Sequence, residues 1–231
     1  NKYDNKSNSN GNRKACVSIV PIFNHLNESQ MVEIMNVTKS VKFKKGSFIY
    51  RAGDKSDSLY IVSRGRVKIF RLSDNGKEQL LRILNPGDFT GELALFSETT
   101  HESFAQAIEE TNCCTVKRDA MQALLAKFPS ISLKLLSEFS NRLENSEKQT
   151  TRFATESVET RLALFLCECL DSRNPDNIIT LPMSKKDLAS YLGTTPETIS
   201  RKLHDFEESG YIRQTGGRKI EIIDPDGLLM V

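Results

Sequence analysis

The spacing of apolar residues changes twice along this chain. Residues 1–14 contain almost none and are rich in Asn, Ser and Lys, which is typical of a disordered tail. Between Val41 and about Arg118, short β-type runs alternate with turn signals such as Asn75-Gly76, a strong hairpin pair. The runs cover residues 47–50, 59–62, 67–70 and 80–84. This pattern predicts an all-β sandwich or barrel.

Helical spacing replaces the β-type runs from about Met121, and a shorter helix is predicted before the barrel, over about residues 27–36. Pro129 is expected to break or restart the helical pattern. A long helix is then predicted over about residues 131–154. Within it, residues recur at alternating spacings of three and four: Leu136, Phe139, Leu143, Ser146, Thr150 and Phe153. This spacing is typical of a coiled coil, here with a polar lower half. The alternative is a single helix packed on its own domain.

The C-terminal part has the pattern of a winged helix-turn-helix. A helix over about residues 159–170 leads into it. Ser184 stands before Lys185-Lys186-Asp187, which resembles a capping box at the start of a short helix. The apolar face of that helix consists of Leu188, Ala189 and Leu192. Residues 211–223 then follow as the predicted wing.

The second helix of this motif is expected to have two different faces. Gly193 supplies the turn before it, Thr195 can cap it, and Pro196 occupies its first position, where a missing N–H costs nothing. The residues that recur at helical spacing and should face inward are Ile199, Leu203 and Phe206.

Glu197, Ser200 and Arg201 lie on the opposite face, near the start of this helix, which in a helix-turn-helix meets base edges in the major groove. Arg can pair bidentately with guanine, and Glu can accept from cytosine N4. The alternative is an (i, i+4) salt bridge between Glu197 and Arg201 on a solvated face. The surrounding motif favours DNA contact. Further candidate DNA-binding residues are Thr195, Thr198, Lys202, Lys185 and Arg218.

Charge changes this picture little, because the 231 residues carry 32 Lys and Arg against 30 Asp and Glu. The C-terminal part even has more acidic than basic residues. DNA binding must therefore rely on a local face and specific contacts. The chain has no membrane-spanning run and no signal-peptide pattern, so we expect a cytoplasmic protein. Its five cysteines do not indicate a structural disulfide framework.

The order of barrel, long helix and winged helix resembles the CRP/FNR family of bacterial transcription regulators over nearly the whole chain. The run 91–96, Gly-Glu-Leu-Ala-Leu-Phe, and the recognition helix carry the likeness. The resemblance implies an α+β protein. Its expected parts are a tail over residues 1–14, a cyclic-nucleotide-binding-type β jelly roll as sensor over 15–128, a dimerisation helix over 129–156 and a winged helix over 157–231. It also implies a homodimer that binds double-stranded DNA, with RNA polymerase as partner.

Residues Gly91 and Glu92 resemble the phosphate-binding cassette of the cyclic-nucleotide-binding members. In cAMP-binding members this cassette continues to an Arg-Ser or Arg-Thr pair, but here the matching pair is Glu102-Ser103. A carboxylate beside a phosphate is repulsive, and the charge-assisted pair is lost. We therefore expect no cAMP or cGMP, and a vestigial pocket that side chains can fill.

The resemblance is closer to the FNR branch. Residues 103–109 followed by Cys114 resemble the FNR segment that holds its central cluster cysteine. Glu197, Ser200 and Arg201 match the FNR positions that read a TTGAT half-site, which implies a target like TTGAT-N4-ATCAA.

The iron–sulfur cluster of FNR does not carry over, because only Cys16 stands near the N-terminus. One N-terminal and one central cysteine resemble the FNR-like proteins (FLP) of Gram-positive bacteria, which implies a reversible disulfide between Cys16 and Cys114, or Cys113, that sets DNA affinity. The alternative for Cys16 is that it has no functional role. The alternative for Cys114 is that it is simply a buried residue of a strand. Core packing is the better interpretation of Cys167 and Cys169.

Nothing in the sequence indicates an enzyme or a cofactor. His25, His101 and His204 lack metal-ligand spacing, and no catalytic triad or paired carboxylates stand out. Two other hypotheses stay open. The same fold could respond to a small non-cAMP ligand or bind DNA constitutively, or the chain could be a ligand-binding module that acts through protein partners.

Overall fold

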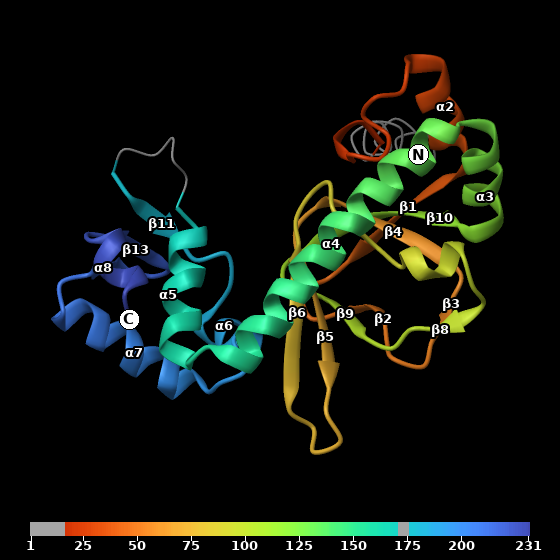
Figure 1. The fold of residues 1–231 in the computed structure, drawn as a ribbon. Helices are drawn as coiled ribbons and strands as arrows, with labels where there is room; N and C mark the ends of the chain where they lie inside the picture. The colour runs from red at the N-terminus through yellow and green to blue at the C-terminus, as the bar shows by residue number, and fades with distance from the viewer. Residues whose placement is uncertain (1–16, 171–175) are drawn as a thin grey trace, which may run out of the picture. The chain divides into compact units, whose positions relative to one another are not determined.

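The computed structural model describes residues 17–170 and 176–231, so the predicted tail over residues 1–14 and Cys16 lie outside the described residues. The chain divides into two compact units, and Figure 1 labels most of their elements. The first comprises the residues up to Asn75 together with Leu81–Arg142. The second comprises Gly76–Leu80 together with Leu143–Val231. Each unit is described by itself below.

The first unit contains the short antiparallel strands that the alternation of β-type runs and turns predicts, except that residues 78–80 of β6 belong to the second unit. One four-stranded sheet has the order β1-β10-β4-β7, a second has the order β2-β9-β5-β6, and β3 pairs with β8. The strands are β1 (Thr38–Phe43), β2 (Phe48–Tyr50), β3 (Lys55–Ser56), β4 (Ser58–Arg64), β5 (Val67–Leu72), β6 (Glu78–Leu84), β7 (Phe89–Thr90), β8 (Thr99–Thr100), β9 (Phe104–Ala107) and β10 (Thr111–Lys117). The α+β fold class inferred from the family resemblance is confirmed.

Strand β10 separates two parts of the hydrophobic core. It pairs with β1 on one side and with β4 on the other. Because successive side chains of a strand point to opposite faces, Cys113 packs with Val62 in one cluster while Cys114 packs with Ile61 in the other. Both cysteines are therefore buried, although in different surroundings.

The cluster around Cys114 also holds the N-terminal segment and two helices. Helix α2 (Glu28–Val37) begins with a capping box, in which Asn27 and Gln30 bond to each other's backbone N–H at 3.0 Å. The buried residues that the segment before α2 contributes are Val17, Val20, Ile22, Phe23 and Leu26. They pack in the same cluster as Ile131 and Leu135, near the start of α4.

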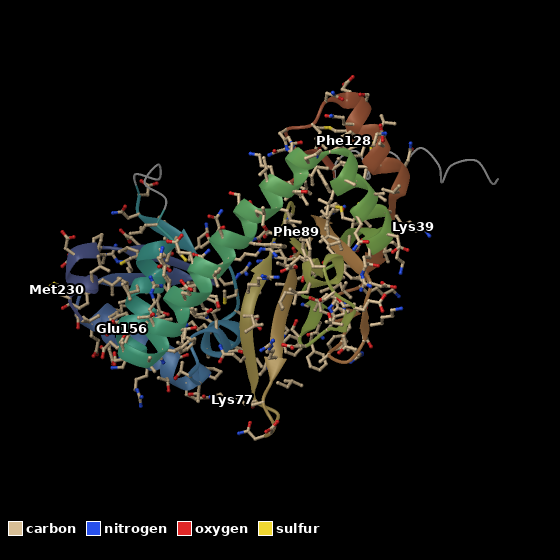
Figure 2. All side chains as sticks on the ribbon, turned by 45° about the vertical axis from the view of Figure 1, so that its right-hand side comes forward. Lys39, Lys77, Phe89, Phe128, Glu156 and Met230 are labelled. Atoms are coloured by element: carbon tan, nitrogen blue, oxygen red, sulfur yellow. The ribbon has the colours of Figure 1, made fainter. Side chains whose placement is uncertain are left out.

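Two helices follow the last strand of the barrel. Helix α3 (Arg118–Lys127) begins directly after β10, and α4 (Pro129–Thr155) begins one residue after Phe128. Phe128 leaves the helical conformation, with φ −125° and ψ 77°, as expected for a residue that precedes a proline. Figure 2 labels Phe128 at this turn. Pro129 thus restarts the helix, and α4 is continuous over 27 residues.

The second unit contains four helices that follow α4, as far as the described residues show, and a small sheet. Its elements are α5 (Val158–Glu168), β11 (Ile178–Thr180), α6 (Lys185–Tyr191), α7 (Pro196–Glu208), β12 (Ile212–Gly216), β13 (Lys219–Ile222) and α8 (Pro225–Leu229). The sheet has the order β11-β13-β12, so β12 and β13 form the predicted wing. Helix α5 ends two residues before the predicted position, with Cys169 as its cap. Across residues 17–170 and 176–231, no helix combines the length and apolarity needed to cross a bilayer.

Candidate DNA-binding surface and barrel pocket

Helices α6 and α7 are joined by the turn that the capping residues predict. The Ser184 hydroxyl accepts a hydrogen bond from the Asp187 backbone N–H at 3.1 Å, which caps α6. Gly193 has φ +70°, a backbone conformation that residues other than glycine rarely adopt. The Thr195 hydroxyl then accepts from the Thr198 N–H at 3.2 Å, and Pro196 is the first residue of α7. Both helix starts are therefore fixed by local hydrogen bonds.

The inward face of α7 is the predicted one. Ile199, Leu203 and Phe206 are buried in the core of this unit. Leu188 and Ala189 of α6 are buried as well. Burial of this one stripe fixes the rotation of α7 about its axis, so the opposite stripe must face outward.

The opposite stripe presents Glu197, Ser200 and Arg201, and all three are exposed. They lie in the first two turns of α7, on one face because residues three and four apart are neighbours on a helix. Within the described part of the chain, no ion pair joins Glu197 to Arg201. The alternative of a surface salt bridge between them is thus not formed in this structure, and both side chains remain available to a ligand.

The other candidate DNA-binding residues differ in their surroundings. The Lys202 ammonium contacts Glu159 at 2.9 Å and Asp205 at 3.4 Å, which favours a role in holding α7 to α5. The Lys185 ammonium donates to the Gln214 side chain at 3.1 Å, so it lies beside the wing. The remaining three candidates are Arg218, exposed in the turn of the wing, and Thr195 and Thr198, which form the cap of α7.

The barrel contains a cavity of about 160 Å³ at the place where the vestigial pocket was predicted. All four predicted pocket residues line it: Gly91, Glu92, Glu102 and Ser103. Gly91 has φ +81°, and a Cβ there would lie 2.4 Å from the Ser58 carbonyl oxygen, so only glycine fits. The side chains present do not fill the pocket completely.

The glutamates in this pocket are paired with arginines in and beside it. Glu92 accepts from Arg142 at 2.7 Å and from Arg82 at 3.1 Å through the same carboxylate oxygen, Oε1. Burial opposes ionisation of Glu92, but the two arginines outweigh burial and hold the pKa of the carboxyl below its ordinary value. Glu102, which stands where a phosphate-binding arginine would be expected, is ion-paired with Arg71.

An aromatic stack forms another wall of the pocket. The rings of His101 and Tyr50 are parallel within 6°, with centroids 3.6 Å apart. The Tyr50 hydroxyl is 2.7 Å from the Thr90 hydroxyl, whereas Nε2 of His101 is buried without a hydrogen-bond partner among the described residues. Burial lowers the pKa of His101 below its ordinary value of 6.5, so the ring is neutral at neutral pH.

The described cysteines differ in state. Cys114 is disulfide-bonded, while Cys113, Cys167 and Cys169 carry free thiols. Burial raises the pKa of Cys113 to about 12 and that of Cys169 to about 11, which makes both thiols poor nucleophiles. Cys16, the partner that the family resemblance implies, lies outside the described residues.

Helix α4 exposes part of the predicted coiled-coil face. Leu136 and Leu143 are 59% and 62% exposed, and Leu133, which the heptad spacing missed, is 70% exposed. Phe139 instead packs edge-on against Phe96, with ring centroids 5.8 Å apart, and is only partly exposed. Phe153 lies in the second unit, where the Arg161 guanidinium stands 4.9 Å from its ring and Gly193 is a close neighbour. Phe153 is nevertheless 37% exposed, and the more exposed residues Leu133, Leu136 and Leu143 form what we call the exposed apolar seam.

Sequence reasoning missed Arg82, Arg142 and the stacked His101. An arginine on the polar side of an amphipathic helix is ordinary, so no sequence signal distinguished Arg142. No group of His, Cys, Asp or Glu within the described ranges could hold a metal ion.

Comparisons with known proteins match both units. The family model for the cyclic nucleotide-binding domain matches residues 40–128, and that for the Crp-like helix-turn-helix domain matches residues 160–231. The chain is 33% identical over 214 residues to the probable transcriptional regulator flp of Lacticaseibacillus casei, covering 93% of this chain and 96% of that protein. It is 30% identical to the fumarate and nitrate reduction regulatory protein of Shigella dysenteriae, covering 88% of this chain and 82% of that one. Among solved structures, FixK2 from Bradyrhizobium japonicum is similar with a TM-score of 0.72 and 28% identity, covering 83% of this chain and 96% of that chain.

Proposed function

Because the chain belongs to the CRP/FNR family of bacterial transcription regulators, we propose that it reads an FNR-type palindrome as a homodimer whose DNA affinity depends on thiol oxidation. As a member of the family it is a DNA-binding transcription regulator and not an enzyme. RNA polymerase as partner and the cytoplasm as location are part of the proposal. The observation that carries it is the exposed stripe of Glu197, Ser200 and Arg201 at the start of α7.

The chemistry of this stripe fits a G·C base pair within each half-site. The guanidinium of Arg201 can donate two hydrogen bonds to guanine O6 and N7, and the carboxylate of Glu197 can accept from cytosine N4. Ser200 can bond to a base edge or to a phosphate. A target of the form TTGAT-N4-ATCAA offers one such pair in each half. The acidic excess of the C-terminal part weakens non-specific attraction, so base contacts must supply much of the affinity.

The test is a titration of TTGAT-N4-ATCAA and of a duplex with the G·C pairs changed to A·T, at one salt concentration. Wild-type protein should prefer the first duplex. Arg201→Ala should lose roughly 1–3 kcal/mol on that duplex and bind both alike, because base readout at this position is gone. Glu208→Gln, exposed at the other end of the same helix, is the matched control and should keep the preference. Equal binding of both duplexes by wild-type protein would refute the proposed target.

The homodimer is supported by the seam on α4. Three large apolar side chains of this helix are each more than half exposed: Leu133, Leu136 and Leu143. Because they lie on one side of α4, they leave an apolar surface without a partner among the described residues. A second copy of the same helix is the occupant we propose, because a palindrome has two-fold symmetry and a C2 dimer buries the same patch on both subunits.

Redox control is supported by the position of Cys114. It is disulfide-bonded and belongs to the cluster that includes Ile131 and Leu135 of α4. We propose Cys16 as its partner, since Cys113, Cys167 and Cys169 carry free thiols. Breaking the bond would loosen the N-terminal segment beneath the start of α4 and thereby shift the population of helix arrangements.

Two cysteine variants separate the trigger from the target. Cys16→Ser should abolish the difference in palindrome affinity between reduced and mildly oxidised protein, whereas Cys167→Ser, the control, should preserve it. A redox response that survives Cys16→Ser would refute this trigger and leave the DNA target standing.

A further inference from the structure

Glu92 is held by two arginines that come from different elements. Glu92 belongs to the 3-10 helix η1 (Glu92–Leu95), Arg82 to β6 and Arg142 to α4. The carboxylate is only 14% exposed and the Arg142 side chain 22%. The contact from α4, at 2.7 Å, is the shorter of the two.

Arg142 makes two more contacts with the barrel. Its Nη2 donates to the Phe89 carbonyl oxygen at 2.9 Å, and its guanidinium carbon lies 4.2 Å from the centre of the Phe89 ring. Figure 2 labels Phe89 beside α4. Phe89 is itself buried and belongs to the core cluster around Cys114. Three different interactions thus hold one long side chain and oppose the rotamer entropy that it loses when it is fixed.

The pairing is required by burial. A buried charge is costly unless a partner of opposite sign compensates for it, and removal of one partner leaves the other uncompensated. Burial lowers the pKa of Arg142 while Glu92 raises it, and the guanidinium remains charged. The contact therefore cannot be given up without a large penalty, unlike the exposed pair of Arg71 and Glu102.

Arg142 lies on the same face of α4 as the buried Ile131 and Leu135, so its contact with Glu92 and this buried face together set the rotation of α4 about its own axis. An α-helix turns by about 100° per residue. Leu143, one position after Arg142, therefore lies about 100° around the helix from it, and Leu136, six positions before, lies about 120° around in the same direction. With Arg142 turned to the barrel, Leu143 and Leu136 share one outward stripe. Helix α4 runs without interruption from Pro129 to Thr155, so the setting at Arg142 is transmitted along its length.

We propose that Glu92 acts as an internal effector: through Arg142 it holds α4 in the rotation that presents the dimer seam, so that DNA reading needs no small ligand in the barrel. The inference rests on the proposed function, because it concerns the dimer that reads a palindrome. The Glu92 carboxylate, which belongs to the chain itself, connects η1 to α4 at the pocket wall. Without it, a bound molecule would have to make this connection.

The test compares a full palindrome with a single half-site duplex. Glu92→Gln and Arg142→Met should each lower palindrome affinity about tenfold, within the usual range of coupling free energies, and leave half-site affinity unchanged. Half-site binding needs only one correctly folded winged helix, so a general loss of folding would lower both affinities. Arg142→Lys, which keeps the charge but loses the fork to Glu92 and Phe89, covers the case in which Arg142→Met does not fold.

The control variant is Arg66→Gln, which removes an ion pair with Glu109 inside the barrel without touching α4. It should bind both duplexes as the wild type does. Wild-type protein that has been unfolded, dialysed and refolded should keep its palindrome affinity, and added cAMP or cGMP should not change it.

Three outcomes are decisive. Unchanged palindrome affinity in Glu92→Gln and Arg142→Lys overturns the internal effector. Loss of palindrome affinity on refolding, restored by cAMP or cGMP, overturns it too. If the wild type shows no preference for the palindrome over random DNA, the proposed function has failed before the effector is reached.

Discussion

Gly193→Ala should destabilise the winged-helix unit more than a backbone argument alone predicts. Gly193 has φ +70°, and placing a side-chain-bearing residue in this left-handed region costs roughly 1–2 kcal/mol. The added Cβ would also lie 2.8 Å from Cε1 of Phe153 at the end of α4, a distance at which the ring must move. Tight overpacking of this kind costs roughly 1–3 kcal/mol more.

The ring is not free to move without cost. The Arg161 guanidinium stands 4.9 Å from the centre of the Phe153 ring and donates to the Leu192 carbonyl oxygen at 3.1 Å, so the arginine holds the ring beside the turn. Displacing the ring forfeits about 0.5–1 kcal/mol of cation–π attraction. The total for Gly193→Ala is therefore about 2.5–6 kcal/mol of unfolding free energy.

The matched control is Gly210→Ala. Gly210 has φ +77°, but a Cβ there meets nothing within 4 Å, so only the backbone cost of about 1–2 kcal/mol applies. Urea unfolding followed by circular dichroism measures both variants, since the chain has no tryptophan. In a Phe153→Leu background the cost of Gly193→Ala should fall toward the control. Equal costs at Gly193 and Gly210 would refute the argument that the ring blocks this position.

Three further predictions follow from other parts of the molecule. Because burial lowers the pKa of His101, the unfolded chain binds a proton more readily than the folded chain below pH 6.5, so stability should fall as pH drops below that value. His101→Gln should weaken this dependence of the melting temperature on pH, and an unchanged dependence would contradict the prediction. Leu136→Glu with Leu143→Glu should shift the protein from dimer to monomer in analytical ultracentrifugation, because charges replace the apolar seam; a persistent dimer would place the interface elsewhere. Cys114→Ser should remove the redox difference in palindrome affinity, measured by fluorescence anisotropy, while a surviving difference would point to another thiol.

Much of the helix-turn-helix could be read from local signals. The caps at Ser184 and Thr195 predict the starts of α6 and α7, the glycine at 193 predicts the turn between them, and the apolar spacing predicts the inward face. The structure agrees with each of these predictions. The reason is that helix starts depend on hydrogen bonds between residues only three positions apart. The exposed face of α7 then follows from the buried one, so the apolar spacing alone identifies the stripe with Arg201.

The heptad spacing of α4 was less informative. It grouped Leu136 and Leu143 with Phe139 and Phe153, although Phe139 packs on Phe96 and Phe153 packs beside Gly193. A periodic pattern states which side of a helix is apolar, but it does not state what lies against that side. Neighbouring elements therefore decided which of these residues remain exposed.

The sequence by itself determined the order of β-rich part, long helix and helix-turn-helix, four of the barrel strands and the outward residues of the recognition helix, because these depend on near neighbours in the chain and on the periods of helix and strand. Tertiary structure alone decided the contact between Glu92 and Arg142, which are 50 residues apart, and the different surroundings of Cys113 and Cys114 on the two faces of one strand. Such contacts depend on which surfaces the packed core brings together. Burial makes this ion pair costly to break, because each charge would be left without compensation if the other were removed.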